Sequence, residues 1–298
     1  MTKFLELVVA GVANGAQYAL VALGFVVIYR ATGVINFAQG GFVVLGAYFA
    51  YDFHQTLGLP FYLSLVLAMA AGALVGVITE ATVLRKLTGE PPFVVIMITI
   101  GVLTIIEQVV PTVWGGNPLP LGDPWGVRSV KAGNINLRVA DLWTIALVIV
   151  VLGAFFLFFR YSKLGVAMRA TAVDLEAALA QGISARRIVS LSWAIAGLVA
   201  ALAGVTLAGG GAGVRPDIEL VALTAFPAII LGGLDSPGGA VVGGIVIGLA
   251  QSLTAGYQPE YASWLGQGFD LVMPYVVMVI VLMVRPYGLF GLRHVRRA

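Results

Sequence analysis

Long stretches without a charged side chain dominate the sequence and recur from near its beginning to residue 284. These charge-free runs are Leu7–Tyr29, Ala31–Tyr51, Phe53–Thr79, Pro91–Ile106, Leu142–Phe159, Ile188–Val214, Leu220–Leu234, Ser236–Pro259 and Leu271–Val284. A helix needs about 20 mostly apolar residues to cross a bilayer, and neutral flanks or tilt extend the shorter runs. The pattern predicts an all-α, polytopic integral membrane helical bundle with about eight to nine transmembrane segments. Glycines interrupt the short runs around Gly232–Gly244, which predicts half-helices or a re-entrant hairpin there.

The composition excludes most classes of soluble protein. Of the 298 residues, 60% are hydrophobic and only 10% are charged, whereas a soluble domain carries about 25% charged residues. A disordered chain, a water-soluble enzyme and a nucleic-acid-binding module are therefore excluded, and membrane lipid is the expected surrounding. We expect a single transmembrane domain over residues 1–298. The first run is longer than the apolar core of a signal peptide, so we expect it to be retained as a span.

Basic residues predict the orientation, because loops on the cytoplasmic side carry an excess of Lys and Arg. The loop at about 160–187 holds five of the 17 basic residues and is predicted to be cytoplasmic. With nine crossings the N-terminus lies outside, and with eight it lies inside; the charges near the N-terminus are too few to decide. The largest external loop is predicted at about 112–141. In this loop and just after it, Trp114, Trp125 and Trp143 are expected to anchor at the membrane interface or to contact an external partner.

Groups that carry enzymatic chemistry are scarce. The chain has no Cys and only two His, too few for a metal cluster built on those ligands. Neither the G-x-S-x-G nucleophile motif nor the phosphate-binding motif G-x-x-x-x-G-K-[ST] occurs. We therefore expect a non-catalytic protein that has no catalytic, cofactor-binding or metal-binding residues and does not bind ATP through a P-loop of its own.

Three polar features inside the predicted spans are candidates for a translocation path. Asn14 and Tyr18 share one face of the first span at helical spacing. Asn36 and Gln39 precede a pair of glycines that permits a broken helix, and Glu107 is a carboxylate within a span. Each feature also has a structural alternative, because such side chains hydrogen-bond neighbouring helices, cap a helix or reach toward the interface.

The predicted cytoplasmic loop contains an amphipathic helical pattern from Leu164 to Gly182. Asp174 and Glu176 fall near the start of a helix that ends around Gly182, where carboxylates and glycine are respectively favoured. Small residues such as Ala177 and Ala178 would let another surface approach this helix closely. The alternative is a helix that only lies against the membrane face.

The segment Glu176-Ala-Ala-Leu-Ala-Gln-Gly182 matches the EAA---G motif of ABC importer permeases at every specified position. The I-x-L-P sequence usual downstream is absent, since Ser192 stands where proline is expected. Together with the segments that begin at Gly15, Asn36 and Leu231, the motif resembles the branched-chain amino acid ABC permease family, of the LivH type, over almost the whole chain.

The resemblance implies a subunit of an ATP-driven importer in the bacterial cytoplasmic (inner) membrane. Its partners would be a second permease subunit (LivM-like or an identical copy), two ABC ATPase subunits, and a periplasmic or extracellular substrate-binding protein. In this family the EAA helix couples the permease to the ATPase. That role falls on Glu176, Ala177, Ala178 and Gly182, with Asp174 at the helix start. The implied substrates are branched-chain or related small amino acids.

Other functions stay open at this point. Permeases for urea, short amides or other small solutes look similar, and the sequence does not separate them from amino-acid permeases. A stand-alone channel or secondary transporter would use Glu107, Asn36 and Gln39 as ion or proton ligands near the membrane midplane. The intact EAA segment in a loop predicted to be cytoplasmic argues against that second reading. A membrane enzyme has little support, for lack of a nucleophile with a base or a metal set.

Overall fold

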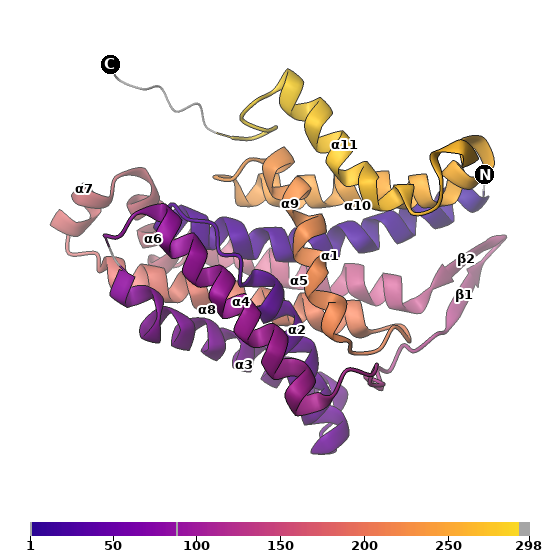
Figure 1. Cartoon of the computed structure of the whole chain (residues 1–298), viewed down its shortest axis with the longest axis horizontal. Coiled ribbons are helices and arrows are strands. Elements are labelled where there is room, and N and C mark those ends of the chain that lie inside the picture. The colour runs from indigo at the N-terminus through magenta and orange to yellow at the C-terminus, as the bar shows by residue number, and fades with distance from the viewer. Residues whose placement is uncertain (1, 88, 292–298) are drawn as a thin grey trace.

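The computed structural model describes residues 2–87 and 89–291, and it consists mainly of long helices that run roughly side by side (Figure 1). The helices are α1 (Thr2–Thr32), α2 (Gln39–Tyr51), α3 (Phe61–Thr82), α4 (Pro92–Trp114), α5 (Val139–Tyr161), α6 (Lys163–Val173), α7 (Leu175–Ala180), α8 (Ala185–Ala208), α9 (Val221–Gly232), α10 (Pro237–Tyr261) and α11 (Phe269–Val284). Two short strands, β1 (Ser129–Ala132) and β2 (Ile135–Arg138), form an antiparallel hairpin. The shorter turns include η2 (Leu84–Leu87) and η3 (Pro216–Leu220).

Among the described residues, six helices are long and apolar enough to cross a membrane, namely α1, α3, α4, α5, α8 and α10. The apolar helix α11 is shorter, with 16 residues, and α2 and α9 have 13 and 12. The prediction of an all-α membrane bundle is thus confirmed, whereas the number of crossings stays a prediction. Two half-helices or a re-entrant hairpin are expected from the sequence around Gly232–Gly244. The expectation is wrong for the second of these segments, which belongs to α10. There α10 runs unbroken for 25 residues, because its glycines lie against neighbouring backbones that stabilise the helix.

The two ends of the bundle hold different parts of the chain. At one end, the guanidinium groups of Arg30 and Arg169 lie 5.4 and 5.5 Å from the ring centre of Phe159, next to α6. At the other end, Lys3 forms an ion pair with Glu260. The N-terminus therefore lies at the end that carries the β-hairpin, and α7 lies at the opposite end (Figure 1). This arrangement is the one expected when the helices cross in alternating directions.

Helix α1 is central, and most of its residues from Gly15 to Ile28 are buried. It packs along α10 through a GxxxG pair on each helix: Gly11 and Gly15 face Gly244 and Gly248. A Cβ added at Gly15 would lie 2.7 Å from the Cα of Ile245, so the two backbones touch. In lipid, where apolar side chains gain little by leaving the solvent, such close backbone contact is a main source of helix association.

The predicted external loop is folded against the bundle. The backbones of Leu119 and Val214 exchange two hydrogen bonds of 2.9 and 2.8 Å, and one carboxylate oxygen of Asp123 accepts from two backbone N–H groups. The expectation that all three tryptophans anchor at the interface is wrong for Trp125, which is only 2% exposed. Its ring stacks on Trp143 at 5.9 Å, so it secures the loop to the bundle rather than to lipid.

The contact between α1 and α10 predicts the effect of a side chain placed there. Replacing Gly248 with Leu drives a side chain into the backbone of Gly15, which no rotamer change relieves. We expect a loss of about 3 kcal/mol or more in the free energy of unfolding. Thermal unfolding in detergent measures it. Gly153→Leu on α5, where an added Cβ meets open space, is the matched control; equal unfolding midpoints for the two variants would contradict the prediction.

Candidate functional site

The loop predicted to be cytoplasmic contains two short helices and leads directly into α8. A side-chain oxygen caps each helix start: Ser162 accepts from Gly165 N at 2.9 Å, Asp174 from Ala177 N at 2.9 Å, and Ser184 from Arg187 N at 3.4 Å. The amphipathic pattern from Leu164 to Gly182 is thus divided into two helices, and α7 begins where Asp174 and Glu176 predicted a helix start. Asp174 adopts an extended backbone conformation (φ −150°, ψ 105°) because it ends α6 and caps α7.

The two alanines of the EAA segment lie in different environments. Ala178 is 4% exposed and faces the protein, whereas Glu176, Ala177 and Leu179 are exposed. The carbonyl of Ala178 accepts from Ile183 N at 3.1 Å, and Gly182 has a φ of +80°, which glycine adopts without strain. The motif thus builds a capped helical turn whose outer surface is small and accessible. The sequence alone did not distinguish Ala177 from Ala178.

The polar face of α1 lies inside the bundle. The hydroxyl group of Tyr18, which is 8% exposed, hydrogen-bonds the side-chain oxygen of Gln251 on α10. Asn14 lies one turn earlier and is half-buried. This arrangement fits the structural alternative, in which polar groups hold two helices together. Gln251 is the partner that sequence analysis missed; its only signal is a polar amide in an otherwise neutral, apolar run.

Asn36 and Gln39 point to different places in the bundle. Asn36 lies in the connection between α1 and α2, where its side-chain oxygen accepts from Ala38 N at 3.0 Å. Gln39 opens α2 and donates from its side-chain nitrogen to the carbonyl of Ala196 on α8 at 3.3 Å. Both side chains are at most 1% exposed. Each keeps one polar atom, Asn36 Nδ2 and Gln39 Oε1, without a hydrogen-bond partner among the described residues.

Glu107 is half-buried on α4, and its carboxyl group hydrogen-bonds that of Glu219 in η3. Such a bond requires that one of the two carry a proton. Burial, together with the nearby carboxylates of Glu107 and Asp217, raises the pKa of Glu219 to about 7. Gly40 lets η3 approach, since a Cβ there would lie 2.6 Å from the carbonyl oxygen of Glu219. Sequence analysis could not pair the two carboxyls, because they are far apart in the chain.

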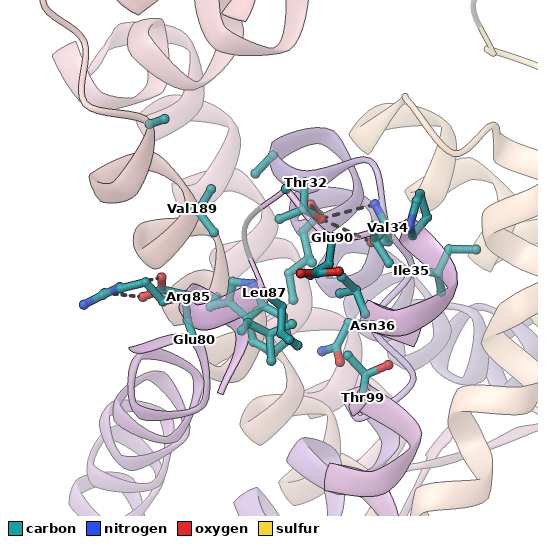
Figure 2. A pocket seen from close by; sticks show the side chains of 18 of the residues that line it. Thr32, Val34, Ile35, Asn36, Glu80, Arg85, Leu87, Glu90, Thr99 and Val189 are labelled. Carbon is teal, nitrogen blue, oxygen red and sulfur yellow. Dashed lines mark hydrogen bonds and ion pairs between the residues drawn. The ribbon is translucent and has the colours of Figure 1, made fainter. Parts of the chain in front are cut away.

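A pocket of about 540 Å³ opens at the end of the bundle that holds α7 (Figure 2). Asn36 lines it, together with residues from the end of α1, from η2 and from the first turns of α4 and α8. Opposite Asn36, Arg85 binds the carboxylate of Glu80 through two hydrogen bonds of 3.0 and 2.5 Å. Of the five path candidates, only Asn36 lines this pocket, and the structure does not bring the five together.

Sequence comparisons with known proteins point to one family, and a structural comparison finds a shared fold. A sequence profile described as "Branched-chain amino acid transport system / permease component" matches residues 7–282. The chain is 30% identical to the high-affinity branched-chain amino acid transport system permease protein LivH of Salmonella typhimurium, over 97% of this chain and 96% of that one. It is 28% identical to BraD of Pseudomonas aeruginosa over the same shares. A solved structure, PsaBC from Streptococcus pneumoniae in complex with Fab, shares the fold with a TM-score of 0.51, 13% identity, and coverage of 93% and 91%.

The carboxyl pair predicts a pH dependence of stability. The raised pKa of Glu219 favours its protonated form in the folded state, so this contribution is complete below about pH 4.5 and is lost as the pH rises through about 7. Glu219→Gln keeps a neutral hydrogen-bond donor at every pH. We expect the unfolding midpoint of the unchanged protein to fall more between pH 5 and 8 than that of the variant. Glu260→Gln at the exposed ion pair is the control and should keep the original pH profile.

Proposed function

Because the chain belongs to the family of branched-chain amino acid transport system permease components, we propose that it forms the translocation path for branched-chain or related small amino acids. The protein is a multi-pass protein of the bacterial inner membrane and a permease subunit of an ABC importer. The observation that carries the substrate class is the match over residues 7–282, together with relatives named for branched-chain amino acids along nearly their whole length.

We assign the coupling role to the surface around α7. Glu176 and Ala177 are exposed on a rigid, capped turn. The small side chain of Ala177 lets an ATPase surface approach closely. Asp174 and Gly182 fix the two ends of that turn, and Ala178 seats it on the permease. Movement of α7 would pass through Ser184 to α8, which lies in the core of the bundle. A rigid-body shift of this kind converts ATPase closure into a change of access.

The proposed assembly supplies what this chain lacks. Two ABC ATPase subunits would bind at the α7 end and hydrolyse ATP, and this subunit would be non-catalytic. A second permease, LivM-like or an identical copy, would complete the path. A substrate-binding protein would dock at the end that carries the β-hairpin, where the loop between α4 and α5 is already folded.

The path itself would run along α4. This helix exposes polar side chains at a spacing of four residues, Thr104, Gln108 and Thr112, and Glu107 lies beside them. A polar face directed at lipid would be unfavourable, so a second permease or a water-filled path is the better neighbour. Asn14, Tyr18, Asn36, Gln39 and Glu107 remain the candidates for the path. Glu107 is the best situated, because Tyr18 and Gln39 already hydrogen-bond within the bundle.

We propose nine crossings, with α2, α9 and α11 added to the six long spans and the N-terminus outside. The sequence contains no Cys, so single cysteines can be introduced and labelled directly. Val173→Cys at the end of α6 and Asn134→Cys in the hairpin turn are both exposed. An impermeant thiol reagent should label the second in intact cells and the first only in inside-out vesicles. Labelling of Val173→Cys from outside would overturn the assignment of α7 to the ATPase.

Reconstitution of the assembled importer in liposomes tests the function. Uptake of L-leucine or L-valine should require ATP and the binding protein. Ala177→Arg places a bulky cation on the exposed face of α7, so we expect uptake to fall at least tenfold and substrate-stimulated ATP hydrolysis to be lost, while the permease still folds. Ala177→Ser keeps the small volume and should transport normally. Uptake driven by an ion gradient in this chain alone would instead support a secondary transporter.

A further inference from the structure

The pocket at the α7 end has the chemistry of a small-ligand site. We infer that it binds a free amino acid with an apolar side chain, on the cytoplasmic side of a single permease subunit. This inference rests on the proposed function for the side of the membrane and for the substrate class. It concerns a site inside one chain, at the start of α4, whereas the polar face that two permeases would share lies further along that helix. At about 540 Å³, the pocket is within the usual range of about 300–1,000 Å³ for small-molecule sites.

Two unpartnered hydrogen-bond donors belong to the side chains that line the pocket. The side-chain nitrogens of Asn36 and Trp193 are buried, and neither has an acceptor among the described residues. Both residues are 1% exposed. A buried N–H without an acceptor costs about 1–3 kcal/mol, so two of them on one pocket point to an acceptor supplied from outside the chain. In Figure 2 the amide nitrogen of Asn36 points away from Thr99, toward the side of the pocket where Leu87 lies.

The charges around the pocket are of both signs. The carboxylate of Glu90 is on the same side as Asn36, whereas the ion pair of Glu80 with Arg85 lies across from it (Figure 2). Arg186, in the first turn of α8, adds a cationic group to the lining. A ligand carboxylate would pair with Arg186 and, once the Asn36 and Trp193 side chains turn toward it, with the two N–H donors, and a ligand ammonium group would pair with Glu90. A ligand with both groups is a zwitterion.

The rest of the lining favours an apolar side chain on that zwitterion. It consists mainly of branched aliphatic residues: Ile28, Val34, Ile35, Leu84, Leu87, Val95 and Val189. Such walls contribute binding free energy in proportion to the apolar area they remove from water, and they exclude polar side chains. An α-amino acid such as leucine or valine combines all three features. Sugars and urea lack the two opposite charges that the polar groups would pair with.

The pocket adjoins the segment that we assign to ATPase coupling, so a ligand bound there could affect coupling. Ala185 and Arg186 line the pocket and lie immediately after the segment that we assign to ATPase coupling. Residues at the start of α4 and at the end of α1 complete it, so a bound ligand joins helices that would move relative to one another. Ligand binding can shift a conformational equilibrium only by its difference in affinity for the two states. Amino acid that accumulates inside the cell would thereby favour the state in which this pocket is formed.

Direct binding to the assembled importer in nanodiscs, without ATP or binding protein, tests the site. The probes are L-leucine, 4-methylpentanoate, which lacks the ammonium group, and 3-methylbutylamine, which lacks the carboxylate. We expect leucine to bind at least tenfold more tightly than either analogue. Glu90→Gln should weaken leucine about tenfold and leave 4-methylpentanoate unchanged. Trp193→Phe, which keeps the ring but removes the donor, should weaken leucine and 4-methylpentanoate and leave 3-methylbutylamine unchanged.

Two further variants keep the test independent of folding. Asn36→Asp retains the oxygen that accepts from Ala38 N and replaces the free donor with an anionic oxygen, so it should weaken leucine and 4-methylpentanoate and strengthen 3-methylbutylamine. Glu260→Gln, at the opposite end of the bundle, should bind leucine normally. Equal binding of all three probes, or leucine binding that none of the pocket variants alters, would overturn this site even if the importer transports leucine. Failure of ATP-driven amino-acid uptake by the unchanged complex would instead overturn the proposed function.

Discussion

Direct contact between helix backbones is the constraint on which this structure depends. In a bilayer, lipid tails compete with apolar side chains, so helices associate only where their surfaces come unusually close. Here glycines on α1 meet glycines on α10, and Gly72 and Gly76 on α3 meet the backbone of α8 around Trp193 and Gly197. Because α1 and α8 both contribute to the buried interior, these crossings determine where nearly every other helix can lie.

The same packing connects the surface around α7 to the interior of the bundle. Helix α8 begins one capped turn after α7 and continues into the buried core, where Ala196 accepts the hydrogen bond of Gln39 from α2. A helix held by backbone contacts resists bending, because there is no side-chain layer that could deform. A displacement applied at the end of α8 next to α7 would therefore be transmitted along its length. This continuity is the physical reason to treat α7, α8 and the neighbouring pocket as one mechanical unit.

Most of the fold could be predicted from the sequence, because apolar length and charge-free runs follow from the thickness of the bilayer. The EAA segment also had local signals, an acidic residue at its start and a glycine at its end. The start of α7 was predicted, because Asp174 and Glu176 suit the beginning of a helix. The separate helix α6 before it was not predicted, since the amphipathic pattern continues across the capping residue. The pair of Glu107 and Glu219 and the pocket around Asn36 depend on tertiary packing of distant segments, which no local pattern reports.

The loop between α4 and α5 forms an ordered surface at the end of the molecule opposite α7. Trp125 is sandwiched into the bundle, and His54 and Gln55 bond the carbonyls of Gly122 and Leu121. Freezing a mobile segment upon association costs about 0.5–1.5 kcal/mol for each immobilised side chain. Any protein that binds at this end would meet a surface whose order was established during folding. Association there costs less conformational entropy, so a selective contact can form over a smaller area.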